Sequence, residues 1–339
     1  FTEAGRSLRD VGYVTKVSRG KGVKFSLLRG GGQGSQSLLE VHQSVAPYPE
    51  EWAFSYPGLA CITNGATYFA NYTLPFLQRD AVKNAFKEFK KRADYLEGET
   101  VKYVGLHISL QNRDFRPDQV ANNMKFKERD YATSDVYGVY DMLNRSHLMV
   151  DFVFDGELTE NNLSRYPVVF LSNSACMSED QAEGIRRYVR NGGTLIATHE
   201  TSIMDELGRK RGNFSLADVF GVDYSLIPQL RDSRHPWQSG PVKGIIYVPK
   251  DADLKEFGHI ICLASEESEV TLRRDSDVEV LCTRSSLKAD DKLNNFRPDM
   301  EYDTGEPGMT VNRFGKGTAI YMCADIGGGY VHNPQPNLT

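Results

Sequence analysis

The sequence predicts an α/β protein in which strands and helices alternate along most of the chain. Three observations lead to this class. Short runs of apolar residues recur with period two, as in strands, while the segments between them carry apolar residues at helical spacing. Glycine and asparagine follow the helical segments, as in Asn191-Gly192-Gly193. Such alternation favours parallel sheets covered by helices on both faces.

The first segment, residues 1–98, has the pattern of one and a half β/α units. Two strands and one helix are predicted in it: 37–43, 66–72 and 79–96. In the first of these strands, Glu40 and His42 share the polar face opposite the apolar residues. These elements are too few to enclose a core by themselves.

The second segment, residues 99–330, repeats the alternation and predicts a flavodoxin-like parallel sheet. Its predicted elements are strands 101–110, 149–154, 168–172 and 194–198, with helices near 134–143 and at 179–190. The second helix has the clearest start, because Ser178 and Gln181 form the pattern of a capping box.

After Val222 the helical period fades, and short β-rich runs separated by charged turns follow. These runs are 244–248, 259–263, 269–272 and 278–282. They predict a β-rich insertion or subdomain at about residues 223–308. A hairpin of strands 309–313 and 318–324 comes next, with glycines in its turn, and we expect its second strand to return to the parallel sheet.

The composition bounds the classes of function. The chain has 339 residues, 40 % of them hydrophobic and 25 % charged, which is enough for two globular domains. The formal net charge of −5, without a cluster of basic residues, argues against nucleic-acid binding. No apolar run approaches the roughly 18 residues that span a bilayer, so a soluble protein without a membrane partner is expected.

Five cysteines are scattered without a CxxC pair, which predicts neither a zinc site nor a disulfide framework: Cys61, Cys176, Cys262, Cys282 and Cys323. We expect no metal and no cofactor. The chain opens at Phe1 in what looks like the middle of a domain, so a signal peptide would lie upstream of it. The compartment therefore stays open between bacterial cytoplasm and periplasm.

The run from Tyr166 to Ser202 contains two distinctive stretches, Pro-Val-Val-Phe-Leu-Ser-Asn-Ser-Ala-Cys-Met-Ser-Glu-Asp-Gln and Asn-Gly-Gly-Thr-Leu-Ile-Ala-Thr-His-Glu. With them, the run resembles the trimerisation domain of β-galactosidases and related glycosyl hydrolases. Asp205–Gly208 and Ser215–Gly221 continue the resemblance. It implies a class I glutamine-amidotransferase-like fold and a homo-oligomer, a trimer.

Amidotransferases of that fold carry a nucleophilic cysteine in the sharp turn after the strand that follows a Gly-Gly pair. Here this strand is 194–198, and His199-Glu200-Thr201 occupy the turn. Neither an imidazole nor a carboxylate replaces the thiolate of a thioester mechanism, and Cys176 follows the preceding strand. The sequence therefore predicts a domain without amidotransferase activity, in which His199 and Glu200 lie at the carboxyl edge of the sheet and face a neighbouring subunit's barrel.

The resemblance also places a catalytic (β/α)8 barrel upstream, with residues 1–98 as its C-terminal part and 99–330 as the trimerisation-like domain. In that architecture a glutamate at the end of the seventh strand is the nucleophile, and Glu40 falls at the matching position. A solvated surface glutamate and another role in the pocket remain the alternative interpretations of Glu40. The acid/base partner would come from an earlier barrel strand, so the chain alone is expected to be inactive.

Residues near Glu40 are candidate contacts for an oligosaccharide or glycoside substrate: His42, Trp52, Tyr56, Asn71 and Tyr72. Aromatic rings stack on apolar sugar faces, although loop aromatics also anchor loops to a scaffold. The family more usually has a Trp/Arg pair where Asn71 and Tyr72 stand, so the sugar stays open. The expected function is a retaining exo-glycosidase of β-galactosidase type; a non-catalytic assembly or carbohydrate-binding protein and an α-fucosidase-like hydrolase are the alternatives.

Overall fold

The computed structural model divides the chain into two compact units, Phe1–Val101 and Lys102–Thr339. It describes residues 2–3, 12–13, 15–17, 26–29, 63–64, 68–71, 79–95, 98–116, 131–225, 243–256, 258, 261–265, 267–285 and 303–332. None of the helices formed by these residues is long and apolar enough to cross a bilayer.

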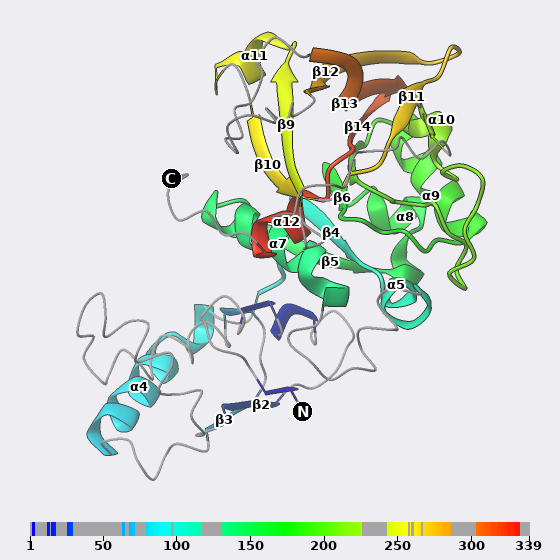
Figure 1. Ribbon diagram of the computed structural model, residues 1–339. Helices are drawn as coiled ribbons and strands as arrows, with labels where there is room; N and C mark the ends of the chain where they lie inside the picture. The colour runs from blue at the N-terminus through cyan, green and yellow to red at the C-terminus, as the bar shows by residue number, and fades with distance from the viewer. Residues whose placement is uncertain are drawn as a thin grey trace. The chain divides into compact units, whose positions relative to one another are not determined.

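Among its described residues, the first unit has three parallel strands that are hydrogen-bonded in chain order, and a helix follows them (Figure 1). These elements are β1 (Thr2–Glu3), β2 (Ser26–Arg29), β3 (Tyr68–Asn71), α4 (Arg79–Lys91) and the 3-10 helix η2 (Ala93–Tyr95). Parallel strands that neighbour each other in chain order need crossover connections, and this arrangement repeats around a β/α barrel. The predicted strand at 66–72 and the predicted helix at 79–96 are confirmed, whereas 37–43 lies outside the described residues.

A nine-stranded sheet forms the centre of the second unit, in the order β10-β9-β12-β13-β14-β7-β6-β4-β5. The four strands that the sequence predicted for its parallel part are confirmed, with small changes at their ends: β4 (Val104–Ile108), β5 (Val150–Phe154), β6 (Val168–Leu171) and β7 (Thr194–Thr198). Their buried, β-branched and apolar residues are typical of parallel strands covered on both faces.

Helices lie on both sides of this parallel part (Figure 1). The helices of the parallel part are α5 (Leu110–Phe115), α7 (Tyr131–Arg145), α8 (Glu160–Leu163), α9 (Glu179–Arg190), α10 (Ala217–Phe220) and α12 (Ile326–His332). The connection from β4 to β5 runs across the sheet in the opposite direction to the connections from β5 to β7. Right-handed crossovers therefore place α7 on the face opposite to α8 and α9. The sequence predicted α7 and α9 but missed the shorter helices, because one or two turns carry little periodicity.

The start of α9 is fixed as the sequence predicted. The hydroxyl of Ser178 accepts the N–H of Gln181, and the side chain of Gln181 accepts the N–H of Ser178 in return. One face of the helix is buried against the sheet, through Ala182, Ile185, Tyr188 and Val189. The capping box fixes the start of α9 after β6, and the buried stripe holds the helix against the sheet.

The β-rich insertion continues the same sheet with antiparallel strands and does not form a separate subdomain. Its strands are β9 (Lys243–Pro249), β10 (Ile261–Ser265) and β12 (Asp277–Ser285), which are followed by β13 (Asp303–Phe314), and the short helix α11 (Ala252–Lys255) follows β9. β14 (Gly317–Met322) pairs with β13 antiparallel and with β7 parallel, so the predicted return to the parallel sheet is confirmed. β8 (Val222–Tyr224) and β11 (Val270–Leu272) pair in a second, two-stranded sheet.

The largest core cluster of the described residues lies between the parallel strands and the helices α9 and α10. Phe220 and Tyr321 stack within it with ring centroids 5.0 Å apart, and the ring of Phe214 lies 5.4 Å from that of Tyr321. Both stacked side chains are fully buried, so this aromatic group excludes water behind the end of β7. The turn that follows β7 is thus built on a rigid base.

Candidate functional site

The structure describes little of the predicted sugar site. Asn71 is the last residue of β3, at the carboxyl end of a parallel strand. The other five predicted site residues lie outside the described residues: Glu40, His42, Trp52, Tyr56 and Tyr72. The nucleophile and the substrate contacts therefore stay predictions, and the polar groups that the structure does bring together are at the carboxyl edge of the second unit's sheet.

The turn after β7 is a strained elbow with His199 at its tip. His199 has φ of +52°, a left-handed conformation that residues other than glycine rarely adopt. The hydroxyl of Tyr321 donates to the backbone oxygen of His199, which holds the turn on the aromatic core. Its imidazole Nδ1 lies 3.1 Å from the hydroxyl oxygen of Ser268 and 3.4 Å from the backbone oxygen of Cys323. The turn where an amidotransferase would have its nucleophile thus has an elbow conformation, but the residue at its tip is the buried His199.

Glu200, the next residue, joins two basic side chains. Its carboxylate accepts a hydrogen bond of 3.0 Å from Arg116 and lies 3.5 Å from the ammonium of Lys210. Burial acts to raise the pKa of Glu200, but the electrostatic interactions with His199, Arg116 and Lys210, together with the hydrogen bond to Lys210, outweigh burial and lower the pKa. Glu200 is therefore a carboxylate at neutral pH and fixes Arg116, which is itself buried, across the elbow.

Burial also controls the charge of His199. It lowers the pKa of the imidazole, and the nearby guanidinium of Arg116 acts in the same direction, while the acidic groups of Glu200 and Asp135 oppose both. The lowered pKa makes the imidazole neutral at neutral pH. The predicted placement of His199 and Glu200 at the sheet's carboxyl edge is confirmed, with the two side chains held by different partners.

A pair of buried carboxyl groups lies at the same edge. Asp135 of α7 accepts a hydrogen bond of 2.7 Å from the side-chain amide of Asn173, and Asp325 accepts one of 3.0 Å from the N–H of Gly328. A Cβ atom placed on Gly328 would lie 2.2 Å from a carboxyl oxygen of Asp325 and 2.9 Å from one of Asp135, so the two groups face each other there. Burial, followed by the charge of Asp135, raises the pKa of Asp325 well above its usual range. Asp325 therefore keeps its proton to a higher pH than an ordinary aspartate does.

Serine, histidine and aspartate meet at the ends of β4, β5 and β6. Nδ1 of His107 lies 2.8 Å from the hydroxyl oxygen of Ser174, and Nε2 lies 3.3 Å from a carboxylate oxygen of Asp155. The other oxygen of Asp155 accepts the N–H groups of Leu110 and Gln111 in the first turn of α5. The residue types are those of a hydrolase triad, but His107 is 0 % and Ser174 1 % exposed. No substrate reaches this serine, so the three side chains join the strand ends.

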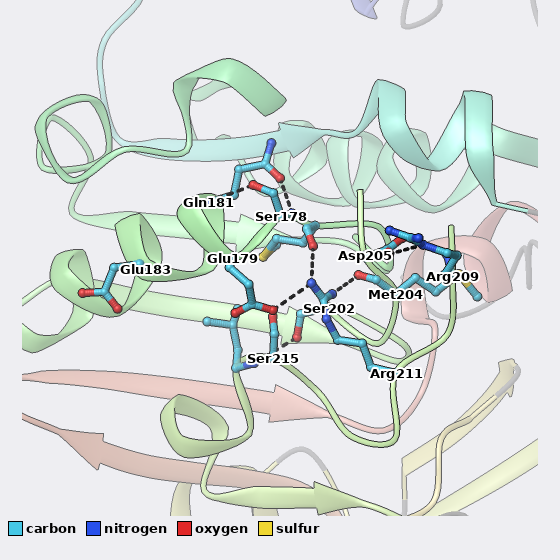
Figure 2. Close-up of polar contacts among 12 residues, drawn as sticks. Ser178, Glu179, Gln181, Glu183, Ser202, Met204, Asp205, Arg209, Arg211 and Ser215 are labelled. Atoms are coloured by element: carbon cyan, nitrogen blue, oxygen red, sulfur yellow. Dashed lines mark hydrogen bonds and ion pairs between the residues drawn. The ribbon is translucent and has the colours of Figure 1, made fainter. Parts of the chain in front are cut away.

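A partly buried arginine joins the loops after β6 and β7 (Figure 2). The guanidinium of Arg211 donates to the backbone oxygen of Met204, to the backbone oxygen of Met177 at 3.0 Å, and to the carboxylate of Glu179 at 2.9 Å. The loop from Ser202 to Arg211 is therefore tied to the start of α9. The carboxyl edge is a closed polar framework, and the described residues contain no group of three side chains suited to a metal ion.

Sequence reasoning found His199 and Glu200 but missed the other ionisable residues of this edge. Asp135 lies inside a helix and Asp325 follows the last strand of the sheet, about 190 residues further along the chain. The sequence indicates that these two residues lie close together only through their positions, since Asp325 follows a strand end and Asp135 lies on a helix that faces it. His107 gives a clearer signal, because it interrupts an apolar strand.

Comparison with known proteins finds a family match within the second unit. Residues 110–244 match the family described as "Beta-galactosidase trimerisation domain". This part of the chain is therefore similar to a β-galactosidase trimerisation domain. The match extends from α5 to the start of β9, so the matched segment includes the elbow at His199, Glu200 and the Arg211 loop.

Curated relatives of the trimerisation domain and its surroundings are bacterial β-galactosidases. β-Galactosidase BgaB of Geobacillus sp. (strain Y412MC61) is 27 % identical over 191 residues, which cover 55 % of this chain and 23 % of the relative. β-Galactosidase BgaA of Planococcus sp. (strain 'SOS Orange') is 25 % identical over 205 residues, which cover 58 % and 24 %. The chain therefore matches about a quarter of the length of these proteins.

Solved structures extend the likeness beyond the trimerisation domain to nearly the whole chain. The β-galactosidase from Bacillus circulans sp. alkalophilus has a TM-score of 0.67 at 17 % identity and covers 98 % of this chain and 48 % of its own. The α-L-fucosidase isoenzyme 2 from Paenibacillus thiaminolyticus has a TM-score of 0.64 at 14 % identity, with 97 % and 45 % covered. At such identities the likeness shows the fold: the end of a (β/α)8 barrel, then a flavodoxin-like domain with a β-rich insertion.

Proposed function

We propose that the complete protein carrying this chain is a glycoside hydrolase, a retaining exo-glycosidase of β-galactosidase type that assembles through its trimerisation domain into a homotrimer. The observation that carries the proposal is the trimerisation-domain match at residues 110–244, joined to the end of a barrel with the fold of solved glycosidases. The chain spans less than half of those structures. The proposal therefore concerns the complete protein, with a glycoside or oligosaccharide as substrate and residues 1–98 as the end of its catalytic domain.

The closed carboxyl edge of the second unit supports the assignment of catalysis to the barrel and of assembly to the second unit. The elbow position that a thiol nucleophile would need holds His199, and Cys176 is buried with its N–H donated to the side chain of Asn112. The second unit therefore lacks the amidotransferase chemistry of its fold class, and catalysis is assigned to the barrel. In the barrel, Glu40 is the proposed nucleophile, with a second carboxylate about 5–5.5 Å from it as acid/base.

The test is Glu40→Gln in the complete protein, assayed with an activated β-galactoside. Glutamine has nearly the same shape but forms no glycosyl ester, so turnover should fall by several orders of magnitude, on the order of 10³ or more, while the protein stays folded. Azide should then occupy the vacated space and restore part of the rate as a glycosyl azide. Glu279→Gln is the matched control, because Glu279 is an exposed glutamate on strand β12, and its activity should equal that of the wild type.

The same assays separate the alternatives. Near-normal activity of Glu40→Gln would end the nucleophile assignment, and lost activity without azide rescue would make Glu40 a residue that binds substrate or orients other groups. The likeness to an α-L-fucosidase makes an α-L-fucoside the second substrate to test. Hydrolysis of the fucoside alone would identify an α-fucosidase-like enzyme. A wild-type protein that hydrolyses neither sugar would be a non-catalytic assembly or carbohydrate-binding protein.

A further inference from the structure

The turn between α9 and β7 contains an asparagine that two glycines follow, Asn191-Gly192-Gly193. An Asn-Gly pair is chemically labile, because the side-chain amide of asparagine reacts with the backbone nitrogen of the next residue and glycine does not shield that nitrogen. The chain has two such pairs, Asn64-Gly65 and Asn191-Gly192, and the described residues include both members of the second. Asn191 and Gly192 are exposed, so water reaches them.

The structure gives each of the two reacting groups another partner. The backbone N–H of Gly192 donates to the backbone oxygen of Val189 at 3.0 Å, and Gly192 has φ of +116°, a conformation that suits glycine after a helix end. The side-chain amide of Asn191 donates to the carboxylate of Glu160, the first residue of α8. The reaction therefore requires that the end of α9 opens and that the amide of Asn191 leaves Glu160.

The hydrogen bond between Asn191 and Glu160 joins two helices. The two residues are 31 positions apart, and α8 packs beside α9 in the fold (Figure 1). The backbone hydrogen bonds at the end of α9 break easily, because helix ends fray. The bond to Glu160 is stronger than those between neutral groups, because its acceptor is charged. It therefore sets how often the amide of Asn191 is able to react.

We propose that Asn191 is a site of spontaneous deamidation and that Glu160 sets its rate. When the turn opens, the nitrogen of Gly192 loses its proton to hydroxide and attacks Cγ of Asn191. The new C–N bond closes a succinimide ring, the C–N bond of the side-chain amide breaks, and its nitrogen takes up a proton and leaves as ammonia. Water then adds to one of the two ring carbonyls and opens the ring, which leaves aspartate or isoaspartate at position 191. No atom is oxidised or reduced in these steps.

The product changes the charge and the length of a packed turn. A carboxylate at position 191 faces the carboxylate of Glu160, so an attraction between α8 and α9 becomes a repulsion between like charges. The new charge also lies at the C-terminal end of α9, where the helix dipole disfavours a negative group. Isoaspartate lengthens the backbone beside Arg190, whose oxygen accepts the N–H of Lys316 at 2.9 Å in the β13–β14 hairpin. Deamidation should therefore loosen the attachment of α9 to α8 and to this hairpin.

The experiment incubates the complete protein at mildly alkaline pH and follows deamidation at position 191 by peptide mapping with mass spectrometry. The Glu160→Ala variant should deamidate there roughly three- to tenfold faster than the wild type, the range expected for one lost hydrogen bond. Glu160→Gln keeps an oxygen acceptor and should have an intermediate rate. Glu183→Ala is the matched control, because Glu183 lies on α9 and pairs with Arg186 and Arg187, and it should keep the wild-type rate within about twofold.

Two references complete the experiment. A synthetic peptide of residues 184–198 gives the rate without a fold and should react faster than every folded protein, and circular dichroism checks that the variants are folded. Equal rates for Glu160→Ala and the wild type would overturn the role of Glu160. An intact Asn191 in every protein, over a time in which the peptide reacts completely, would overturn the site itself.

Asn191→Asp gives a second measurement, because it introduces the charge of the product directly. Its thermal midpoint should lie below that of the wild type. The same substitution in the Glu160→Gln background should lower the midpoint less, since the repulsion needs both carboxylates. An equal fall in both backgrounds would show that the two side chains do not interact, and Glu160 would then have no role at this site.

Discussion

At the scale of single residues, the carboxyl edge shows how burial decides protonation. Asp325 faces Asp135 in a buried place, and two ionised carboxylates cannot stay close together there. The carboxyl group of Asp325 also has a structural role, because it accepts the N–H of Gly328 at the start of α12. A neutral residue of the same shape would therefore do the structural work of Asp325 at any pH.

Asp325→Asn should make stability less dependent on pH. The pKa of Asp325 is raised in the folded state, so above its ordinary value near 3.9 the unfolded chain releases a proton that the folded chain keeps. The free energy of unfolding of the wild type therefore falls as pH rises from about 4, and the variant lacks this fall. Thermal midpoints at pH 4 to 8 should show the variant gaining on the wild type by roughly 2–4 °C, the shift that about 1 kcal/mol produces in a domain of this size.

The control for this titration is Asp253→Asn, which changes an exposed aspartate on α11. Its midpoint should run parallel to that of the wild type at every pH. If the curve of Asp325→Asn is also parallel to the wild type, Asp325 is ionised in the folded protein and the assignment of a raised pKa to it is wrong.

Arg211 offers a second prediction at this scale (Figure 2). Arg211→Ala removes hydrogen bonds to two backbone oxygens and to Glu179, and should lower the free energy of unfolding by about 1–3 kcal/mol. Arg209→Ala is the comparison, since Arg209 is 74 % exposed and pairs with Asp205 at the surface, where ion pairs contribute about 0–1 kcal/mol. Urea unfolding measures both, and equal losses would show that Arg211 is no more than a surface ion pair.

At the scale of elements, glycines set the distance between helices. Gly138 of α7 lies against Gly327 of α12, and a Cβ atom on Gly138 would be 2.1 Å from the backbone oxygen of Gly327. The two helices therefore approach backbone to backbone. This contact brings Asp135 of α7 next to Asp325, so the carboxyl pair depends on the close packing of α7 and α12.

Gly138→Ala should separate these helices. Alanine favours an isolated helix over glycine by about 1 kcal/mol, but the clash with Gly327 should cost about 1–3 kcal/mol and outweigh that gain. The thermal midpoint should fall, and amide hydrogen exchange should accelerate in α12. Gly156→Ala, where a Cβ atom meets nothing within 4 Å, should keep the wild-type midpoint. A Gly138→Ala protein as stable as this control would show that α12 adjusts without cost.

At the scale of the whole molecule, the second unit has a parallel sheet like that of class I glutamine amidotransferases. Interacting side chains close the carboxyl edge of this sheet. The elbow after β7 holds the neutral imidazole of His199 where an amidotransferase has its cysteine. Cys176, which follows the preceding strand, is 1 % exposed. We therefore expect the unit to assemble the protein and the barrel to carry the chemistry.

Cys176→Ala tests this division. Any glycosidase activity of the complete protein should be unchanged within about twofold, since a buried thiol outside the barrel takes no part in it. Glutamine should release no ammonia above the uncatalysed rate in either protein. Ammonia release by the wild type that Cys176→Ala abolishes would show a working amidotransferase site.

The sequence by itself determined the parallel strands and the longer helices of the second unit and the cap of α9, because these depend on local periodicity and on neighbours three or four residues apart. It also identified the position of His199 after its strand and the class of domain. Only the tertiary structure decided that the β-rich insertion extends the main sheet, since antiparallel pairing of β12 with β13 depends on contacts between distant residues. The same holds for the pairs Asp135 with Asp325 and His107 with Asp155. Burial raises the pKa of Asp325, and contacts with His107 and nearby donors lower the pKa of Asp155 against the effect of burial. Both effects depend on neighbours that the chain acquires only when it folds.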